Sequence, residues 1–206
     1  FRDNEQGRIN SNEFTMLEFY RVDFTMHQLM DEIAELLAAL GKNEPIKKMS
    51  YAEVFFEYSD IDILNSDINE LKTILNSLDL NSDDEWIEDI QMHLFVHLIE
   101  PKLKEIPVCF IYDFPKDQAA LAEIHGPVAH RFEMYINGTE IANGYQEIQS
   151  AQEYRDRFNE ELNKRKVLSK SFELLDHSFL KDLEEGLPYC SGVAIGIERL
   201  YSSLGL

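Results

Sequence analysis

The stretch FRDNEQGRINSNEFTMLEFYR, residues 1–21, decides how the remaining chain is interpreted. Its first half is polar and rich in turn formers, whereas residues 13–20 mix β-favouring aromatics with carboxylates, as a half-buried strand does. An arginine binds two phosphate oxygens through its planar donors, an exposed ring stacks on a base, and a carboxylate holds an ammonium group. Arg2, Phe14 and Glu18 together therefore suggest a site for a nucleotide and a cationic small molecule. A surface hairpin with solvated charges explains any one of them alone.

A second informative stretch, CSGVAIGIERL at residues 190–200, lies near the other end of the chain. Its alternating small residues let a ligand lie against the backbone, and Arg199 enters a helix start, where phosphate is favoured. The two stretches resemble motif 2 and motif 3 of the class II aminoacyl-tRNA synthetases in their lysine-specific form, and residues 140–147 match a stretch between those motifs. The resemblance covers almost the whole chain. It is nearest to the lysyl-tRNA synthetase paralogues that lysylate elongation factor P.

The resemblance implies an α+β fold, in which an antiparallel β-sheet flanked by helices forms a class II synthetase-like catalytic domain. At 206 residues the chain can bury a substantial core as one domain, residues 1–206. Because it begins inside motif 2, we interpret it as a catalytic-domain fragment whose N-terminal part, with motif 1, is missing. Helical spacing at several places predicts a mainly helical insertion at about residues 42–105.

Charge is the largest departure from an average composition, since 19 Lys and Arg stand against 39 Asp and Glu, a formal net charge of −20. So acidic a surface repels phosphate backbones, which argues against tRNA as a partner but leaves room for ATP in a local arginine pocket. Cys109 and Cys190 make no disulfide framework, which favours a cytoplasmic setting. No apolar run is long enough to span a bilayer, so we expect no membrane partner.

Regular elements are predicted on both sides of the insertion. Over residues 26–40, apolar side chains recur every three or four positions after a capping box of Thr25 and Gln28 and before a stop at Gly41. The continuous apolar run PVCFIYDF at residues 107–114 predicts a central strand. We expect the helix to pack on the sheet that motif 2 begins and to serve a structural role.

A further helix is predicted over residues 85–99, and Pro101 should end it. His93 and His97 lie one turn apart in this helix, so a zinc site must be weighed against an ordinary helix with two histidines on its polar face. The stretch lacks the adjacent glutamate of a metalloprotease helix, which favours the ordinary helix.

A β-hairpin is predicted by the alternating residues 129–136 and the Asn-Gly dipeptide at 137–138, the strongest short-range signal for a two-residue type I′ turn. With that turn, Glu133 pairs with Ala142 and shares a face with Glu140, as diagonal neighbours about 7–8 Å apart or less. Two carboxylates so placed repel each other unless a cation such as Mg²⁺ sits between them. An exposed acidic hairpin explains the spacing equally well. The resemblance favours magnesium, because these positions match metal-binding glutamates of the family.

The next question is which face of the sheet the residues after Glu140 occupy. Strict alternation puts Asn143 and Tyr145 on the opposite face from Glu140, although Gly144 permits a bulge that turns them back. The resemblance implies such a distortion, because Asn143, Tyr145 and Glu147 match positions that hold the lysine substrate.

The resemblance assigns a role to each candidate residue. Arg2 would bind the α-phosphate of ATP and Arg199 the γ-phosphate, as the catalytic residues, and Phe14 and Arg199 would sandwich the adenine. The residues implied in ATP binding are Arg2, Asp3, Asn4, Phe14, Glu140, Ile141, Gly196 and Arg199. Those implied in holding the lysine-like substrate are Glu18, Tyr20, Asn143, Tyr145, Glu147 and Ala194. Glu133 and Glu140 would hold Mg²⁺, and no general base is required.

The implied activity is the ATP-dependent formation of a lysyl or β-lysyl adenylate and its transfer to a lysine side chain of elongation factor P, by a homodimer. The main alternative is the catalytic domain of a lysyl-tRNA synthetase. The acidic charge, Ala194 in place of the usual glycine, and residues 114–122 (FPKDQAALA) argue against it. A non-catalytic ligand sensor is favoured by Asn4 and Asn10, which replace the family's usual glutamate and histidine. The presence of both arginines and both metal-binding glutamates opposes it.

Overall fold

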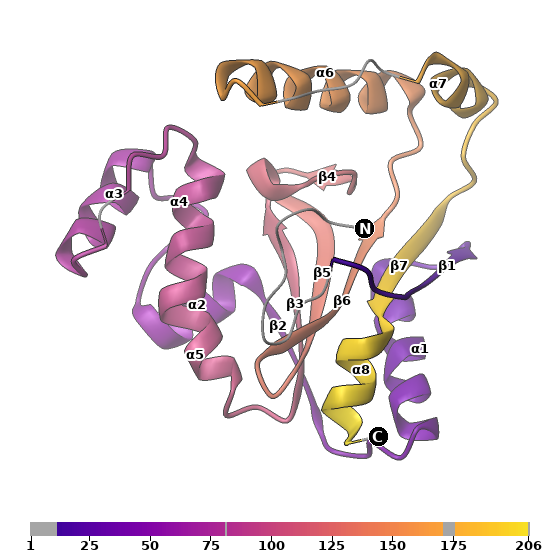
Figure 1. The fold of residues 1–206 in the computed structure, drawn as a ribbon, viewed down its shortest axis with the longest axis horizontal. Coiled ribbons are helices and arrows are strands. Elements are labelled where there is room, and N and C mark those ends of the chain that lie inside the picture. The colour runs from indigo at the N-terminus through magenta and orange to yellow at the C-terminus, as the bar shows by residue number, and fades with distance from the viewer. Residues whose placement is uncertain (1–11, 81, 171–175, 206) are drawn as a thin grey trace.

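A seven-stranded β-sheet forms the centre of the molecule (Figure 1). The computed structural model describes residues 12–80, 82–170 and 176–205. The strand order is β1-β7-β6-β5-β3-β2, with β4 beside β5, and only the pair of β2 and β3 is parallel among the described pairs. The strands are β1 (Met16–Val22), β2 (Ile46–Ser50), β3 (Val108–Pro115), β4 (Ile124–His125), β5 (Val128–Ile136), β6 (Thr139–Gln146) and β7 (Cys190–Gly196).

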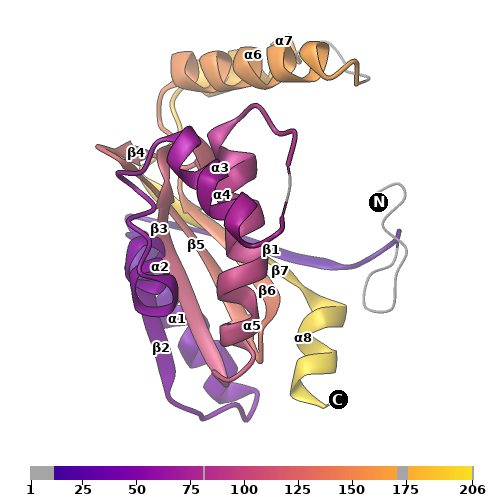
Figure 2. The same ribbon diagram turned by 90° about the vertical axis from the view of Figure 1, so that its left-hand side faces the viewer.

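Helices pack on both faces of this sheet (Figure 2). They are α1 (Met26–Ala39), α2 (Tyr51–Ser59), α3 (Ile68–Ser77), α4 (Ile87–Leu94), the π-helix η1 (Phe95–Ile99), α5 (Glu100–Leu103), the 3₁₀ turn η2 (Lys116–Gln118), α6 (Ala151–Val167), α7 (His177–Glu184) and α8 (Ile197–Leu204). An antiparallel-rich sheet with helices on its faces confirms the predicted α+β class.

Two hydrophobic clusters show which helices cover which face. On one face, α1 and α8 bury side chains such as Ile33 and Leu200 against β5, β6 and β7. On the other face, α2 to α5 bury a second cluster against β2 and β3, where Ile111 is fully buried. Ile111 pairs with Glu133, so the face of β5 that carries Glu133 continues the surface that these helices cover.

The helix α1 forms as its sequence predicts. The Thr25 side chain accepts a hydrogen bond from the Gln28 amide, and the Gln28 side chain accepts one from the Thr25 amide, which completes the capping box. Its apolar stripe is buried, and Gly41 follows with a φ of 91°, a left-handed conformation that glycine adopts at little cost. This helix therefore supports the sheet from the face opposite Glu133.

The predicted insertion at 42–105 contains helices α2 to α5 but also the edge strand β2. The sequence missed β2 because a five-residue strand between polar residues offers little periodicity. Pro101 does not end the preceding helix, contrary to expectation. It lies in the first turn of α5, directly after the π-helix η1, so the hydrogen-bond pattern of the helix changes just before the proline.

The β5–β6 hairpin turns at Asn137 and Gly138, whose φ angles of 47° and 77° are both positive, as a type I′ turn requires. Beyond the turn the predicted register is wrong by one residue. Glu133 pairs with Asn143 and not with Ala142, because the ladder shifts between Met134 and Tyr135. One residue of β6, Ile141, is therefore extra, which is the mark of a β-bulge.

The helices α6 and α7 lie together at one end of the molecule, beyond the end of the sheet that carries β4 (Figure 1). Ser150 caps α6 by accepting a hydrogen bond from the Glu153 amide. Tyr154 of α6 is buried in a small cluster with Leu180 of α7 and Ile148. Among the described residues, no helix has the length and apolar character needed to span a bilayer.

Candidate active site

The bulge at Ile141 brings the predicted substrate-binding residues to one face of the sheet. Beyond it, Asn143 and Tyr145 face the same side as Glu140, because the extra residue reverses the alternation. The predicted distortion is therefore present, but its position is not Gly144. A Cβ at Gly144 would lie 2.4 Å from the Phe132 ring, so this glycine leaves room for the side chain of its paired residue.

Two rows of paired residues cross four strands on this face. The first row joins β5, β6, β7 and β1, and the second lies beside it, two residues along each strand. The members of the first row, in strand order, are Glu133, Asn143, Ala194 and Glu18. Those of the second are Arg131, Tyr145, Gly192 and Tyr20. Directly paired residues project their side chains to the same side, so the two rows form a polar surface with small residues on β7.

Arg131 organises one end of the first row, a role that the sequence analysis did not assign to it. Its guanidinium donates to Glu133 Oε1, to the Gln118 carbonyl at 2.9 Å and to Asn143 Oδ1 at 3.3 Å. The Arg131 and Glu133 side chains are only 18% and 10% exposed. Asn143 in turn donates to the Tyr145 hydroxyl at 3.0 Å. The alternation of β5 already placed Arg131 beside Glu133, and this was the available signal.

Glu133 and Glu140 form a hard-oxygen donor set. Tyr135 donates to the second carboxylate oxygen of Glu133, and Arg199 Nη1 lies 3.4 Å from Glu140 Oε2 and donates to the Glu140 carbonyl at 3.0 Å. Burial and then the charge of Glu133 raise the pKa of Glu140, whereas Arg199 opposes this. Each carboxylate oxygen still has acceptor capacity, and a cation near both would relieve their repulsion. The residues present therefore fit Mg²⁺.

Glu147 and Tyr20 converge over the backbone of Gly192. A Cβ on Gly192 would lie 2.5 Å from the Tyr20 ring and 2.7 Å from Glu147 Oε1. Glu147 is 7% exposed, and burial raises its pKa to about 7, although a hydrogen bond from the Tyr154 hydroxyl opposes the rise. A buried carboxylate with one hydrogen-bond donor is a favourable place for an ammonium group, which would restore its charge.

The remaining predicted nucleotide-binding residues lie partly within and partly outside the described part of the chain. Ile141 packs in the core beneath α1 and α8, so only its backbone can line a ligand. Phe14 is half-buried just before β1, and a Cβ on Gly196 would have no neighbour nearer than the Ile141 carbonyl at 3.8 Å. The nucleotide-binding candidates Arg2, Asp3 and Asn4, and also Asn10, lie outside the described residues.

The pair of His93 and His97 was weighed as a zinc site, and its geometry matches an ordinary helix surface. The rings lie 6.5 Å apart and nearly perpendicular, and His97 Nδ1 contacts the His93 carbonyl at 2.7 Å. His93 also lies 3.3 Å from Asp84. In the part of the chain that the structure describes, the group of three metal-ligating side chains lies elsewhere.

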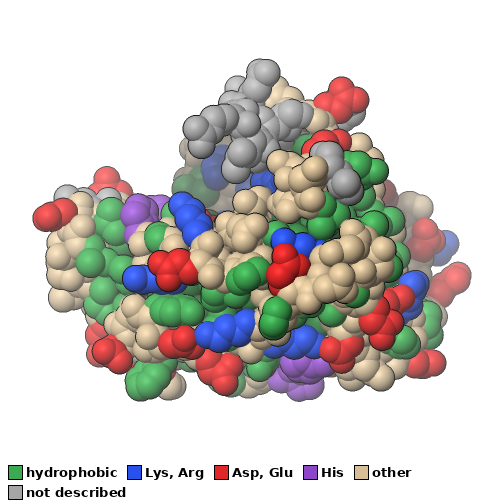
Figure 3. All heavy atoms as spheres, turned by 90° about the horizontal axis from the view of Figure 1, so that it is seen from below, with side chains coloured by type: hydrophobic (Ala, Val, Ile, Leu, Met, Phe, Trp, Pro, Cys, Tyr) green, Lys and Arg blue, Asp and Glu red, His purple; other side chains and the backbone are tan. Residues whose placement is uncertain are grey.

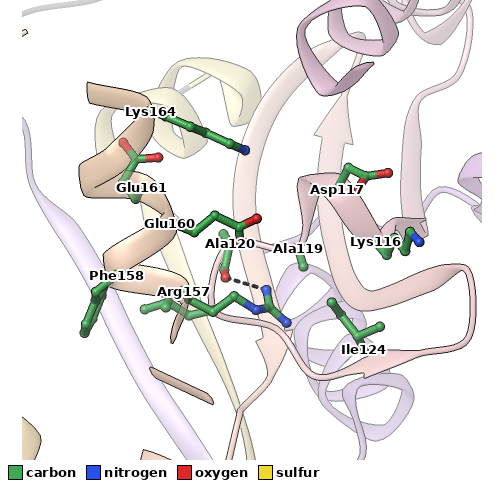
Figure 4. Close-up of a pocket in the computed structure, with 11 residues that line it drawn as sticks. Lys116, Asp117, Ala119, Ala120, Ile124, Arg157, Phe158, Glu160, Glu161 and Lys164 are labelled. Atoms are coloured by element: carbon green, nitrogen blue, oxygen red, sulfur yellow. Dashed lines mark hydrogen bonds between the residues drawn. The ribbon is translucent and has the colours of Figure 1, made fainter. Parts of the chain in front are cut away.

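A cavity of about 460 Å³ opens between α6 and the turn η2, separate from the two rows (Figure 4). Arg157 reaches across it and donates to the Ala120 carbonyl at 3.0 Å. Lys164, which also lines it, binds Glu88 of α4. Its charged groups thus serve to hold α6 against the rest of the domain.

Comparison with known proteins shows the family of this chain. The family described as tRNA synthetases class II (D, K and N) matches residues 1–205. The chain belongs to this family. Three similar proteins are elongation factor P–(R)-beta-lysine ligases. That of Proteus mirabilis (strain HI4320) is 42% identical over 206 residues, which cover 97% of this chain and 63% of the relative. Those of Edwardsiella ictaluri and Vibrio cholerae are each 40% identical over 97% of this chain, and cover 63% and 64% of the relatives.

This class II chain therefore spans just under two thirds of the length of these relatives. The predicted family resemblance is confirmed. In class II terms, motif 3 corresponds to β7 and the start of α8, and the second half of motif 2 corresponds to β1. These two strands are antiparallel neighbours, with Glu18 opposite Ala194, so segments from opposite ends of the chain share the site.

Proposed function

We propose that this chain is the catalytic part of an enzyme that activates (R)-β-lysine or lysine with ATP and transfers it to a lysine side chain of elongation factor P. The two rows carry the proposal, because they present carboxylates, an amide and phenols on the face of the sheet that also carries Glu140, the partner of Arg199. The printed function of the relatives supplies the amino acid and the acceptor.

The first reaction joins a substrate carboxylate oxygen to the α-phosphorus of ATP, and the bond from that phosphorus to pyrophosphate breaks. Such a step requires positioning and neutralisation of charge, with little covalent help from the protein. Arg199 provides a cation held in place by Glu140, and Arg2 remains the expected partner on the α-phosphate. Mg²⁺ at Glu133 and Glu140 would neutralise charge on the phosphates.

The amino-acid pocket is proposed over both rows, on the side where Glu147 lies. Glu147, which accepts a hydrogen bond from Tyr154, would receive one ammonium group of the substrate, and the exposed Glu18 would receive the other. Asn143 and Tyr145 would orient the substrate through the amide and hydroxyl that Arg131 holds in place. Two separate carboxylates favour a substrate with two ammonium groups, as lysine and β-lysine have.

In the second reaction the acceptor lysine amine attacks the activated carbonyl, loses a proton, and AMP leaves with the electron pair of the broken bond. A protein acceptor suits the acidic balance of this chain. Figure 3 shows basic side chains separated by acidic and apolar ones on one face, which is unlike the continuous basic surface that RNA favours. The runner-up, a lysyl-tRNA synthetase catalytic domain, is supported by the breadth of the matched family.

One experiment tests the proposal. The full-length protein is given ATP and radiolabelled lysine or β-lysine, with either elongation factor P or total tRNA as acceptor. We expect label on the factor and not on tRNA. Label on tRNA at a synthetase-like rate, with none on the factor, would establish the runner-up. Amino-acid-dependent exchange of pyrophosphate into ATP separates either enzyme from a ligand sensor.

A homodimer and a cytoplasmic location belong to the same proposal. Cys109 and Cys190 are free and buried, which suits a reducing compartment. Sedimentation of the full-length protein measures its oligomeric state, and a monomer at the concentrations at which the enzyme is active would contradict the homodimer.

A further inference from the structure

Five ionisable side chains gather on the opposite side of the sheet from the two rows. Three of them, Glu123, His125 and His130, come from β4, β5 and the residue before β4. Asp113 lies in β3, and His27 in the first turn of α1. His130 directly precedes Arg131 in a continuous strand, so its side chain projects away from the proposed active site. The proposed reaction makes no use of this group.

The β4–β5 pairing fixes the three nearest side chains. Ile124 pairs with Ala129, and the His130 amide donates to the Glu123 carbonyl at 2.8 Å. One ligand atom from each of Glu123, His125 and His130 lies within 4.8 Å of the other two. His125 Nε2 is 3.2 Å from Glu123 Oε2, and the two imidazole rings are 4.2 Å apart between centroids. Two imidazole nitrogens and a carboxylate oxygen therefore converge on one small volume.

Asp113 provides a second, independent observation. It occupies the bulge between Tyr112 and Phe114 with a φ of 53°, a conformation that is unfavourable for a residue with a Cβ. Its Oδ1 atom is buried and has no hydrogen-bond partner within the described residues. Buried polar atoms without a partner are rare, and a cation bound nearby would provide this one with an electrostatic partner. Burial raises the pKa of Asp113, and the charges of His130, His27 and His125 oppose the rise.

We propose that Glu123, His125 and His130 bind one divalent transition-metal ion, for which Zn²⁺ fits best, with Asp113 as a nearby negative charge. Imidazole nitrogens favour zinc and its neighbours in the transition series, whereas Mg²⁺ prefers an all-oxygen set. A water molecule would complete a four-coordinate shell. The ion would tie β4 to β5 and stabilise the end of the sheet beneath α6.

The state of the two imidazoles is compatible with this site. A neutral imidazole offers a metal ion the lone pair of one ring nitrogen. The rings are stacked within 7° of parallel, whereas a metal binds in the plane of each ring. Binding therefore requires His125 to turn about its side-chain bonds. Its side chain is 55% exposed, so this rotation has room.

Metal titration of the intact protein tests the site. The protein is treated with a chelator, exchanged into excess Mg²⁺ to occupy carboxylate sites, and titrated with Co²⁺, whose visible absorption reports its ligands. We expect one Co²⁺ per chain, displaced by one Zn²⁺. His125→Ala and Glu123→Gln should each weaken binding about 100-fold, since each removes one of three protein ligands. Both positions are partly or fully exposed, so circular dichroism should remain that of the parent.

The matched control is the double variant His93→Ala, His97→Ala, which removes two neighbouring histidines from a helix surface. It should bind Co²⁺ with the parent affinity. The proposal is overturned if the parent binds no Co²⁺ in the presence of Mg²⁺. It is equally overturned if the folded His125 and Glu123 variants bind as the parent does, or if only the control loses binding. None of these readouts requires enzymatic activity, so they are independent of the proposed function.

Discussion

Gly192→Ala would test whether Tyr20 and Glu147 form the amino-acid pocket. The new Cβ would lie 2.5 Å from the Tyr20 ring and 2.7 Å from Glu147 Oε1, so one of these side chains must move. Tyr20 is 59% exposed and can swing outward, which keeps the cost in folding free energy near the lower end of the roughly 1–3 kcal/mol typical of overpacking. The displaced ring would no longer close the pocket.

We expect the loss to appear in substrate use. If the contact of the Tyr20 ring with the substrate stabilises the transition state by about 1.4–2.8 kcal/mol, its loss lowers kcat/KM for the amino acid roughly 10- to 100-fold. Amino-acid-dependent pyrophosphate exchange with the full-length protein measures this, and the KM for ATP should change little. Gly196→Ala is the comparison in the same strand, because its new Cβ would have no neighbour nearer than 3.8 Å and its implied ligand is ATP, so the KM for the amino acid should not change. An unchanged KM for the amino acid in Gly192→Ala, or an equal rise in Gly196→Ala, would refute the reasoning.

Three further outcomes are expected. Because burial raises the pKa of Glu147 to about 7, the KM for the amino acid should rise as the pH falls below about 7. Tyr154→Phe removes a hydrogen bond that lowers this pKa, so the rise in KM should begin at a higher pH. A rise that begins at the same pH in the variant would show that the hydrogen bond does not set the pKa. Arg131→Met leaves Glu133 buried without its cation and should lower the free energy of unfolding by about 3–5 kcal/mol in urea titrations, whereas a loss below about 1 kcal/mol would contradict the ion pair's importance. Ala194→Gly widens the pocket by one methyl group, worth about 1–3 kcal/mol of discrimination, so the ratio of rates on lysine and β-lysine should change; a constant ratio means that Ala194 is not the selector.

Local sequence signals predicted the elements that depend on neighbouring residues. The capping box of Thr25 and Gln28, the Asn137-Gly138 turn and the buried strand around Ile111 all formed as expected. These signals act within a few residues, so the sequence carries them directly. The strand β2 carries no such signal, since its place is set by parallel pairing with β3, about sixty residues further along the chain.

The sequence named the candidate site residues but gave the geometry of the strands that carry them only in part. Glu133, Asn143 and Glu18 share one row, although the resemblance gave Glu133 to the metal and the other two to the amino acid. The sequence placed the distortion at Gly144, because glycine is the usual mark of a bulge, whereas the extra residue is the apolar Ile141, held in the core. The part played by Arg131 depends on contacts with the Gln118 backbone and with Asn143, which only the folded chain brings together.

The single extra residue, Ile141, determines which face of the sheet each later residue of β6 occupies. Upstream, Glu140 is paired opposite Tyr135, on the side assigned to nucleotide and metal. Downstream, Asn143 and Tyr145 face that side only because the strand has been shifted by one position. If Ile141 were instead paired in a regular ladder, without the bulge, every later residue of β6 would change face, with Gly144 presented to the substrate and Tyr145 driven into the core. Deleting Ile141 would remove the bulge and leave Asn143 and Tyr145 opposite Glu133 and Arg131. The residues proposed for the nucleotide and those proposed for the amino acid thus share one face because of Ile141, whose own side chain packs in the core.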